Sequence, residues 1–317
     1  MRTAAIDCGT NSIRLLIADV DGGAGLTDVV RLMRVVRLGE GVDATGTLSE
    51  AALDRTFKAV DEYAALIKEH DAGRIRFVAT SATRDASNRD VFVAGVRDRL
   101  GVEPEVVSGD EEAELSFSGA ASVLAGESDA AVLVVDLGGG STEFVVGTGN
   151  QVIAARSMDM GCVRFTERFL RSDPPTEQEI AAAEEEIGRM IDEANAEVNL
   201  ASVHGVIGVA GSITTVTAHA LRLPEYQPER IHGTSLTVEE IDAATTSLLH
   251  LPRSERAALP YMHPGRVDVI GAGALIWRTI VRRVADATQG RVQSAAASEH
   301  DILDGIALSA ASRGERG

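Results

Sequence analysis

The stretch Asp7-Cys8-Gly9-Thr10-Asn11-Ser12 decides the fold, because the chain contains it twice. Its second copy is Asp136-Leu137-Gly138-Gly139-Gly140-Ser141, with Asp, Gly and Ser at the same offsets. Each copy stands between two apolar runs, which indicates a β-hairpin whose turn residues separate two strands. The two Asp residues, at positions 7 and 136, lie 129 residues apart, about one domain length. The sequence therefore predicts a duplicated unit.

The chemistry of both turns suits a phosphate group. Glycines in a tight turn allow backbone N–H groups to approach an anion, and Ser or Thr hydroxyls add neutral donors. A single loop of this kind would be read more simply as an ordinary hairpin, but two matching copies favour phosphate. The predicted phosphate-binding residues are Gly9, Thr10, Asn11, Ser12, Gly138, Gly139, Gly140, Ser141 and Thr142.

Hydrophobic periodicity predicts strands and helices that alternate in both halves of the chain. Strands are expected at residues 3–8, 13–20, 29–38, 75–79, 105–107, 130–135, 143–146, 152–157 and 203–209. Helices are expected at residues 48–69, 91–100, 267–284 and 298–311, with others opened by capping boxes at Ser108/Glu111, Thr176/Glu179 and Thr237/Glu240. This alternation indicates an α/β protein, and a break at residues 126–129 is the expected domain boundary.

Composition narrows the class of protein. The 317 residues carry a formal net charge of −18, which argues against binding to nucleic acid or to an anionic membrane. Only two cysteines are present, far apart, so we expect a reducing, cytoplasmic location. No run is long and apolar enough to predict a transmembrane helix or a signal peptide.

Together, four motifs resemble the exopolyphosphatase and guanosine pentaphosphate phosphohydrolase (Ppx/GppA) family in its short two-domain form. They are residues 5–12, 79–84 (Ala-Thr-Ser-Ala-Thr-Arg), 108–113 (Ser-Gly-Asp-Glu-Glu-Ala) and 135–143. The resemblance implies two actin-like (ribonuclease H-like) domains with an interdomain active-site cleft. The first would span residues 1–125, rejoined by a helix at 299–317, and the second residues 126–298. It also implies Mg²⁺ as cofactor, with Mn²⁺ possible in its place, and a homodimer.

The resemblance assigns the catalytic base to Glu112, the second Glu of the Glu-Glu-Ala motif. Independently, Glu111 has a structural role as the capping-box acid, which leaves Glu112 available to activate water. The alternative is an acid that merely favours a helix N-terminus. Because phosphoryl transfer needs a metal to neutralise charge, we expect Asp136 and Glu143 to hold Mg²⁺, with Asp7 as a further candidate.

Two more positions match the family. Arg84 follows a strand in a Ser/Thr-rich loop and is expected to bind phosphate, although a surface salt bridge is the alternative. Gly211 and Ser212 resemble the nucleotide-side turn of the superfold, and Ser212 would serve equally as a helix N-cap.

We therefore expect an exopolyphosphatase that releases terminal orthophosphate from inorganic polyphosphate of modest length. The nearest alternative is hydrolysis of guanosine pentaphosphate (pppGpp). Two alternatives of other classes are an actin-like kinase and a sensor that binds polyphosphate or the alarmone without turnover.

Overall fold

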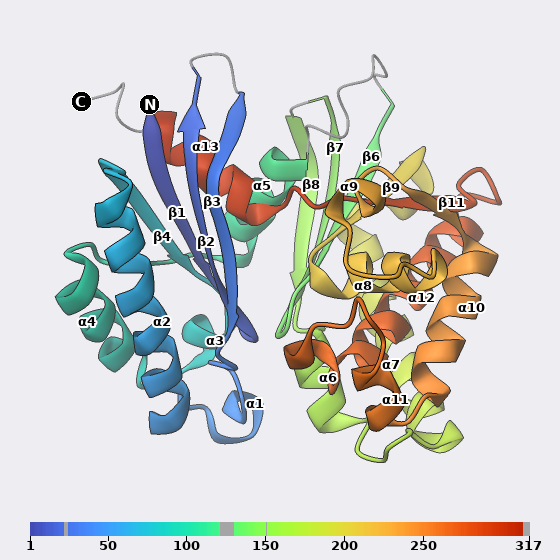
Figure 1. Cartoon of the computed structure of the whole chain (residues 1–317). Coiled ribbons are helices and arrows are strands. Elements are labelled where there is room, and N and C mark those ends of the chain that lie inside the picture. Colours follow the sequence, from blue (N-terminus) through green and yellow to red (C-terminus); the bar gives the residue numbers. More distant parts are fainter. Residues whose placement is uncertain (22–24, 121–129, 150, 313–317) are drawn as a thin grey trace. The chain divides into compact units, whose positions relative to one another are not determined.

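A computed structural model describes residues 1–21, 25–120, 130–149 and 151–312. The chain divides into two compact units, one made of Met1–Gly119 with Asp301–Gly317 and the other of Ala120–His300. The expected break at residues 126–129 lies outside the described residues. Each unit is built on its own β-sheet (Figure 1).

The sheet of the first unit has the order β3-β2-β1-β4-β5. Its strands are β1 (Arg2–Cys8), β2 (Ser12–Val20), β3 (Leu26–Val35), β4 (Arg74–Ala79) and β5 (Glu105–Val106). The first three form an antiparallel meander, and β4 and β5 then add in parallel.

Side-chain alternation in this sheet gives each face its own core. Ala4 and Ile6 of β1 pack with α2 (Glu50–Glu69) and α4 (Arg89–Leu100), whereas Ala5 packs with α13 (Ile302–Ser312) and α5 (Gly109–Ala120). Figure 1 shows α2 and α4 on one side of the sheet and α13 on the other. Asp7 shares the face of Ala5, so its carboxylate lies on the side of α13.

Helices α5 and α13 pack backbone to backbone. A Cβ placed on Gly305 would lie 2.0 Å from the carbonyl oxygen of Leu115, and one on Gly119 would lie 1.8 Å from that of Asp301. Real Cβ atoms essentially never approach closer than 3.0 Å. Glycine at both positions therefore fixes where α5, which carries Glu112, lies in the first unit.

The second unit repeats the strand succession. Its sheet has the order β8-β7-β6-β9-β11-β10. The strands are β6 (Val132–Leu137), β7 (Thr142–Thr148), β8 (Gln151–Met158), β9 (Gly205–Val209), β10 (Ser235–Thr237) and β11 (Ser294–Ala297). As in the first unit, an antiparallel meander precedes two strands that add in parallel, here β9 and β11. The predicted duplication is thus present in the topology as well as in the sequence.

Helices cover the second sheet around one large core. The long ones are α7 (Glu177–Val198), α10 (Val238–His250) and α12 (Ile270–Ala287), with Trp277 of α12 fully buried at 1% exposure. Shorter helices are α6 (Cys162–Arg168), α8 (Gly211–Ala220), α9 (Pro228–Ile231) and α11 (Arg253–Ala257). The capping boxes expected at Thr176 and Thr237 are both confirmed, with both reciprocal hydrogen bonds present.

Several predicted boundaries differ from the structure by a few residues, and two of the differences have clear local causes. The third strand ends at Val35 rather than at residue 38, because the next N–H groups bind the first Gly-rich turn. The last helix begins at Ile302 rather than at residue 298, since Asp301 accepts a hydrogen bond from the Leu303 N–H and caps it. Residues 81–85, expected as a loop, form the short helix α3 (Ser81–Asp85), and α1 (Val42–Thr45) was not predicted.

Candidate active site

The two Gly-rich turns close with the same hydrogen bond. In the first, the Gly9 N–H donates to the Ser12 carbonyl at 3.0 Å, and in the second the Gly138 N–H donates to the Ser141 carbonyl at 3.0 Å. Both turns connect the first two antiparallel strands of their sheet. The shared Asp-x-Gly-x-x-Ser pattern therefore encodes one turn geometry used twice.

The carbonyl groups of the first turn are held by the chain that follows β3. The Thr10 carbonyl accepts from the Gly39 N–H at 2.9 Å, and the Asn11 carbonyl accepts from the N–H groups of Val36 and Arg37 at 3.1 and 2.8 Å. A planar trans peptide points its N–H opposite to its C=O. The following N–H groups thus face away from this segment.

The second turn is held in the same manner by α6. The carbonyls of Gly138 and Gly139 accept from the N–H groups of Cys162 and Val163 at 3.0 and 2.9 Å. The Gly140 carbonyl accepts from the Arg164 guanidinium at 2.9 Å. Consecutive N–H groups of this turn therefore point away from α6, an arrangement that suits an anion.

Arg164 is a residue that the sequence reasoning did not place at the site. The Thr142 hydroxyl, predicted to bind phosphate, donates to the Met160 carbonyl and is fully buried. This bond gives Thr142 a structural role, and its contact with phosphate stays a prediction.

The two hairpins differ at the position opposite the Asp. Asp7 is the register partner of Arg14, whereas Asp136 is the register partner of Glu143. Side chains directly opposite on neighbouring strands lie on the same face, with Cβ atoms about 4.5–5.5 Å apart. The first hairpin therefore pairs a carboxylate with a guanidinium, whereas the second hairpin places two carboxylates side by side.

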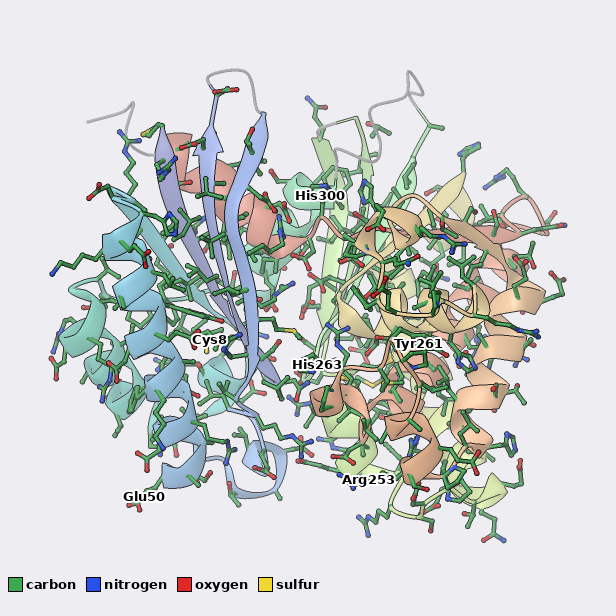
Figure 2. The ribbon with its side chains drawn as sticks, in the orientation of Figure 1. Cys8, Glu50, Arg253, Tyr261, His263 and His300 are labelled. Carbon is green, nitrogen blue, oxygen red and sulfur yellow. The ribbon has the colours of Figure 1, made fainter. Side chains whose placement is uncertain are left out.

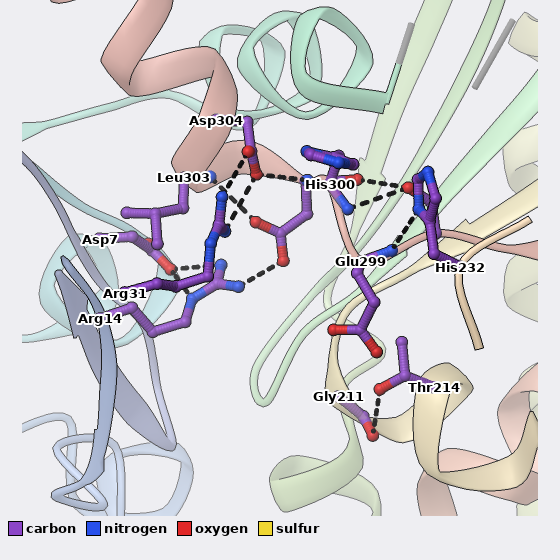
Figure 3. A network of polar contacts seen from close by, with 12 residues as sticks. Asp7, Arg14, Arg31, Gly211, Thr214, His232, Glu299, His300, Leu303 and Asp304 are labelled. Atoms are coloured by element: carbon purple, nitrogen blue, oxygen red, sulfur yellow. Dashed lines mark hydrogen bonds and ion pairs between the residues drawn. The ribbon is translucent and has the colours of Figure 1, made fainter. Parts of the chain in front are cut away.

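In the first hairpin, Arg14 forms an ion pair with the Asp7 carboxylate. Arg14 donates to Asp7 at 2.6 and 2.9 Å and also forms an ion pair with Asp301 (Figure 3). Burial raises the pKa of the Asp7 carboxyl, and Arg14 acts in the opposite sense. Asp7 thus has a cationic partner in Arg14, and its role as a metal ligand stays a prediction, as do those of Asp136 and Glu143.

The acid pair of the second hairpin fits a divalent cation. Asp136 is 6% exposed and Glu143 1% exposed, and the Ser157 hydroxyl donates to Glu143 at 2.8 Å. No group of three or more His, Cys, Asp or Glu side chains gathers around a metal position in the described part of the chain. Mg²⁺ is commonly held by one or two carboxylates together with water and substrate phosphates, so two carboxylates are sufficient.

The candidate base lies in a partly buried ion pair. Glu112 is 7% exposed in the first turn of α5, and its carboxylate accepts from Arg84 at 3.1 Å. Arg84 also donates to the Val107 carbonyl at 3.1 Å. Its helix α3 is linked to the first turn by a hydrogen bond between the Ser81 and Thr10 hydroxyls at 2.9 Å. Within the first unit, the Gly-rich turn, Arg84 and Glu112 thus form one connected group.

The adjacent Glu111 contributes to the helix cap and also to an ion pair. Its N–H donates to the Ser108 hydroxyl at 3.2 Å, as half of the expected capping box. Its carboxylate, however, forms an ion pair with Arg76 at 2.6 Å.

The turn at Gly211 is covered by an arginine. A Cβ on Gly211 would lie 2.3 Å from the Arg266 guanidinium. The N-cap of α8 is Ala210, with a left-handed φ of 72°, so the alternative of Ser212 as N-cap was wrong. Ser212 is 6% exposed, inside the helix.

The remaining sulfur and imidazole groups contribute to packing. Cys8 is the last residue of β1 and is buried inside the first unit (Figure 2), and burial raises the pKa of its thiol well above the usual value. His263 accepts a hydrogen bond from the Gly265 N–H at 3.1 Å, and His300 stacks edge to face on His232. These contacts agree with structural roles.

Two sheets of matching strand succession, each with a Gly-rich hairpin at its centre, define an α/β protein of the actin-like superfold. The particular family follows from comparison. A family model described as the Ppx/GppA phosphatase family matches residues 16–310. The chain belongs to the Ppx/GppA phosphatase family.

Relatives of similar length support this assignment. The chain is 48% identical to Exopolyphosphatase 2 of Mycobacterium tuberculosis, over 98% of both chains. The crystal structure of an exopolyphosphatase-like protein matches with a TM-score of 0.94 at 45% identity, covering 99% of each chain. The Ppx/GppA enzyme of Aquifex aeolicus matches with a TM-score of 0.80 at 32% identity, covering 98% of this chain and 99% of that one.

Among the helices of the described residues, none combines the length and the apolar character that crossing a membrane requires.

Proposed function

We propose that this protein is an exopolyphosphatase, which hydrolyses the terminal phosphoanhydride bond of inorganic polyphosphate and releases orthophosphate. Its membership of a phosphatase family and its 48% identity to an exopolyphosphatase support the reaction class. The observation that carries the proposal is the pair of Gly-rich turns whose carbonyl groups are held on one side. Turns of this geometry direct successive N–H groups toward an anion.

In the proposed reaction, the turns bind phosphate oxygens through backbone N–H groups and the hydroxyls of Thr10, Ser12 and Ser141. Arg84 donates to the transferred phosphoryl group, which suits a planar guanidinium. The Glu112 carboxylate takes a proton from the attacking water as oxygen bonds to the terminal phosphorus. The bond from that phosphorus to the bridging oxygen breaks, and the shortened chain leaves with the bonding electrons.

Asp136 and Glu143 would hold Mg²⁺, which when bound neutralises charge on the phosphate oxygens. Buried acids that face each other across two strands repel unless a cation or proton lies between them. Mn²⁺ accepts the same oxygen ligands and is the expected substitute.

Glu112 makes this site suited to hydrolysis. It reaches Arg84 at 3.1 Å, so the carboxylate and the phosphate-binding arginine lie next to each other. The test is orthophosphate release from short polyphosphate with Mg²⁺, for wild type and Glu112→Gln. Loss of a general base should lower kcat by about 10²–10⁴-fold. An unchanged kcat in the variant would remove Glu112 from the mechanism.

Hydrolysis of pppGpp is the second candidate function, because the family name covers both activities. The surroundings of Gly211 bear on the choice between pppGpp and polyphosphate. The Arg266 guanidinium lies against this glycine, where a nucleotide would approach in an actin-like protein, and this favours polyphosphate. Assays with pppGpp and with short polyphosphate at equal phosphate concentration separate the two. Turnover of pppGpp alone would reverse the assignment, and binding without turnover would indicate a sensor.

Preference for short chains, a homodimer and a cytoplasmic location stay predictions. Light scattering that gives the mass of one chain would contradict the dimer.

A further inference from the structure

Arg76 is the buried arginine of the first sheet, and the reaction proposed above does not use it. It lies on β4 at 4% exposure, on the face that packs against α13. Its guanidinium contacts β5, α5 and α13 through Glu105, Glu111 and Ser309. A fully buried arginine with partners on three elements is placed to fix their relative positions.

Two of these partners meet at a single atom. Nη2 of Arg76 donates to Glu105 at 2.8 Å and to Glu111 at 2.6 Å. The two carboxylates therefore converge on one nitrogen and lie close together. Without the guanidinium between them, two like charges at this separation would repel.

Glu111 immediately precedes Glu112 in the first turn of α5. The far end of this helix packs closely on α13, where Gly119 faces the Asp301 carbonyl and Gly305 of α13 faces the Leu115 carbonyl. Arg76 ties the near end to the sheet, and Arg84 binds the next carboxylate at 3.1 Å. Arg76 thus pairs with Glu111, and Arg84 pairs with the adjacent Glu112.

We propose that Arg76 is a positioning residue for the reaction, which acts through Glu111 and holds the first turn of α5 so that Glu112 meets Arg84. The inference rests on the proposed function, with Glu112 as the base. Release of Glu111 would move this turn away from β5 and shift the Glu112 carboxylate with it. A displacement of about 1 Å in a catalytic group costs about 10²-fold in rate.

The test is a double-mutant cycle on short polyphosphate with Mg²⁺, at a temperature at which circular dichroism shows every variant to be folded. Arg76→Met should lower kcat by about 10²-fold and leave KM unchanged. Glu111→Gln alone should keep kcat close to wild type, because the amide oxygen can still accept from Nη2 of Arg76 and the neutral side chain does not repel Glu105. Arg76→Met with Glu111→Gln should regain most of the lost kcat, since the repulsion is removed.

Arg74→Met is the matched control. Arg74 lies on the same strand and also donates to α13, at the Ala311 carbonyl, 2.7 Å away. It should lower stability without changing kcat. If Arg76→Met does not fold, Arg76→Lys replaces it. A lysine is a point charge without the guanidinium fork, so its kcat should lie between wild type and Glu112→Gln.

The outcomes separate the two claims. A wild-type kcat in Arg76→Met or in its lysine substitute, or a double variant no faster than Arg76→Met, overturns the positioning role. If Glu112→Gln keeps its full rate, the proposed base is wrong, whatever the Arg76 variants show.

Discussion

Gly161 offers the sharpest test of the proposal that the second Gly-rich turn binds phosphate. It precedes α6, whose N–H groups hold the carbonyls of Gly138 and Gly139. A Cβ at Gly161 would lie 2.3 Å from the carbonyl carbon and oxygen of Gly139 and 2.4 Å from the Gly140 nitrogen. These are backbone atoms, which cannot rotate out of the way. Gly161→Ala must therefore push the turn and α6 apart.

The size of the displacement follows from these distances. Ordinary contacts of a Cβ begin at about 3.4 Å, so the turn must move by roughly 1 Å. Overpacking of this kind costs about 1–3 kcal/mol of stability, and a misplacement of about 1 Å in binding groups can cost about 10²-fold in rate. We expect Gly161→Ala to remain folded and to lose most of its kcat/KM.

The assay is orthophosphate release over a range of polyphosphate concentrations, with thermal unfolding measured in parallel. Gly205→Ala is the matched control in the same unit, because its Cβ would meet only the Val132 side chain at 3.8 Å. The reasoning is refuted if Gly161→Ala keeps wild-type kcat and KM. A lower melting temperature with unchanged kinetics would show that the turn is structural and does not contact phosphate.

Three further variants test neighbouring features. Ser157→Ala removes the hydroxyl that donates to Glu143. Because loss of such an outer-shell partner weakens metal binding, the Mg²⁺ concentration needed for half-maximal activity should rise by roughly 10–100-fold. An unchanged Mg²⁺ titration would contradict the proposed metal site. Arg14→Met leaves the buried carboxylates of Asp7 and Asp301 without their arginine. The free energy of unfolding, measured in urea, should fall by about 3–5 kcal/mol. A fall of less than about 1 kcal/mol would count against the importance of this ion-pair network. The Glu179 carboxylate has its pKa lowered to about 2 from 4.5, chiefly by the Thr176 N–H. Its stabilising effect is therefore full above pH 4.5 and is lost as the pH falls toward 2, so wild type and Glu179→Gln should differ in melting temperature at pH 6 and converge in acid.

The amino-acid sequence determined the features that depend on neighbouring residues. The paired Asp-x-Gly-x-x-Ser turns, the apolar runs beside them and the capping boxes at Thr176 and Thr237 use residues within a few positions of each other. Such local patterns can be read without knowledge of the fold. They were enough to predict an α/β duplication and a phosphate-binding role.

Only the tertiary structure decided which charged groups meet. Arg14 lies 287 residues from Asp301, and Arg76 lies 35 from Glu111 and 233 from Ser309. No local pattern encodes these pairs, because they depend on which strands become neighbours. The sequence made Asp7 a metal candidate and Glu111 a capping acid. The fold placed Arg14 against the buried Asp7 carboxylate and the buried Arg76 against Glu111. The same strand pairing set Glu143 opposite Asp136, which distinguishes the second hairpin, with two acids, from the first, where Arg14 lies opposite Asp7.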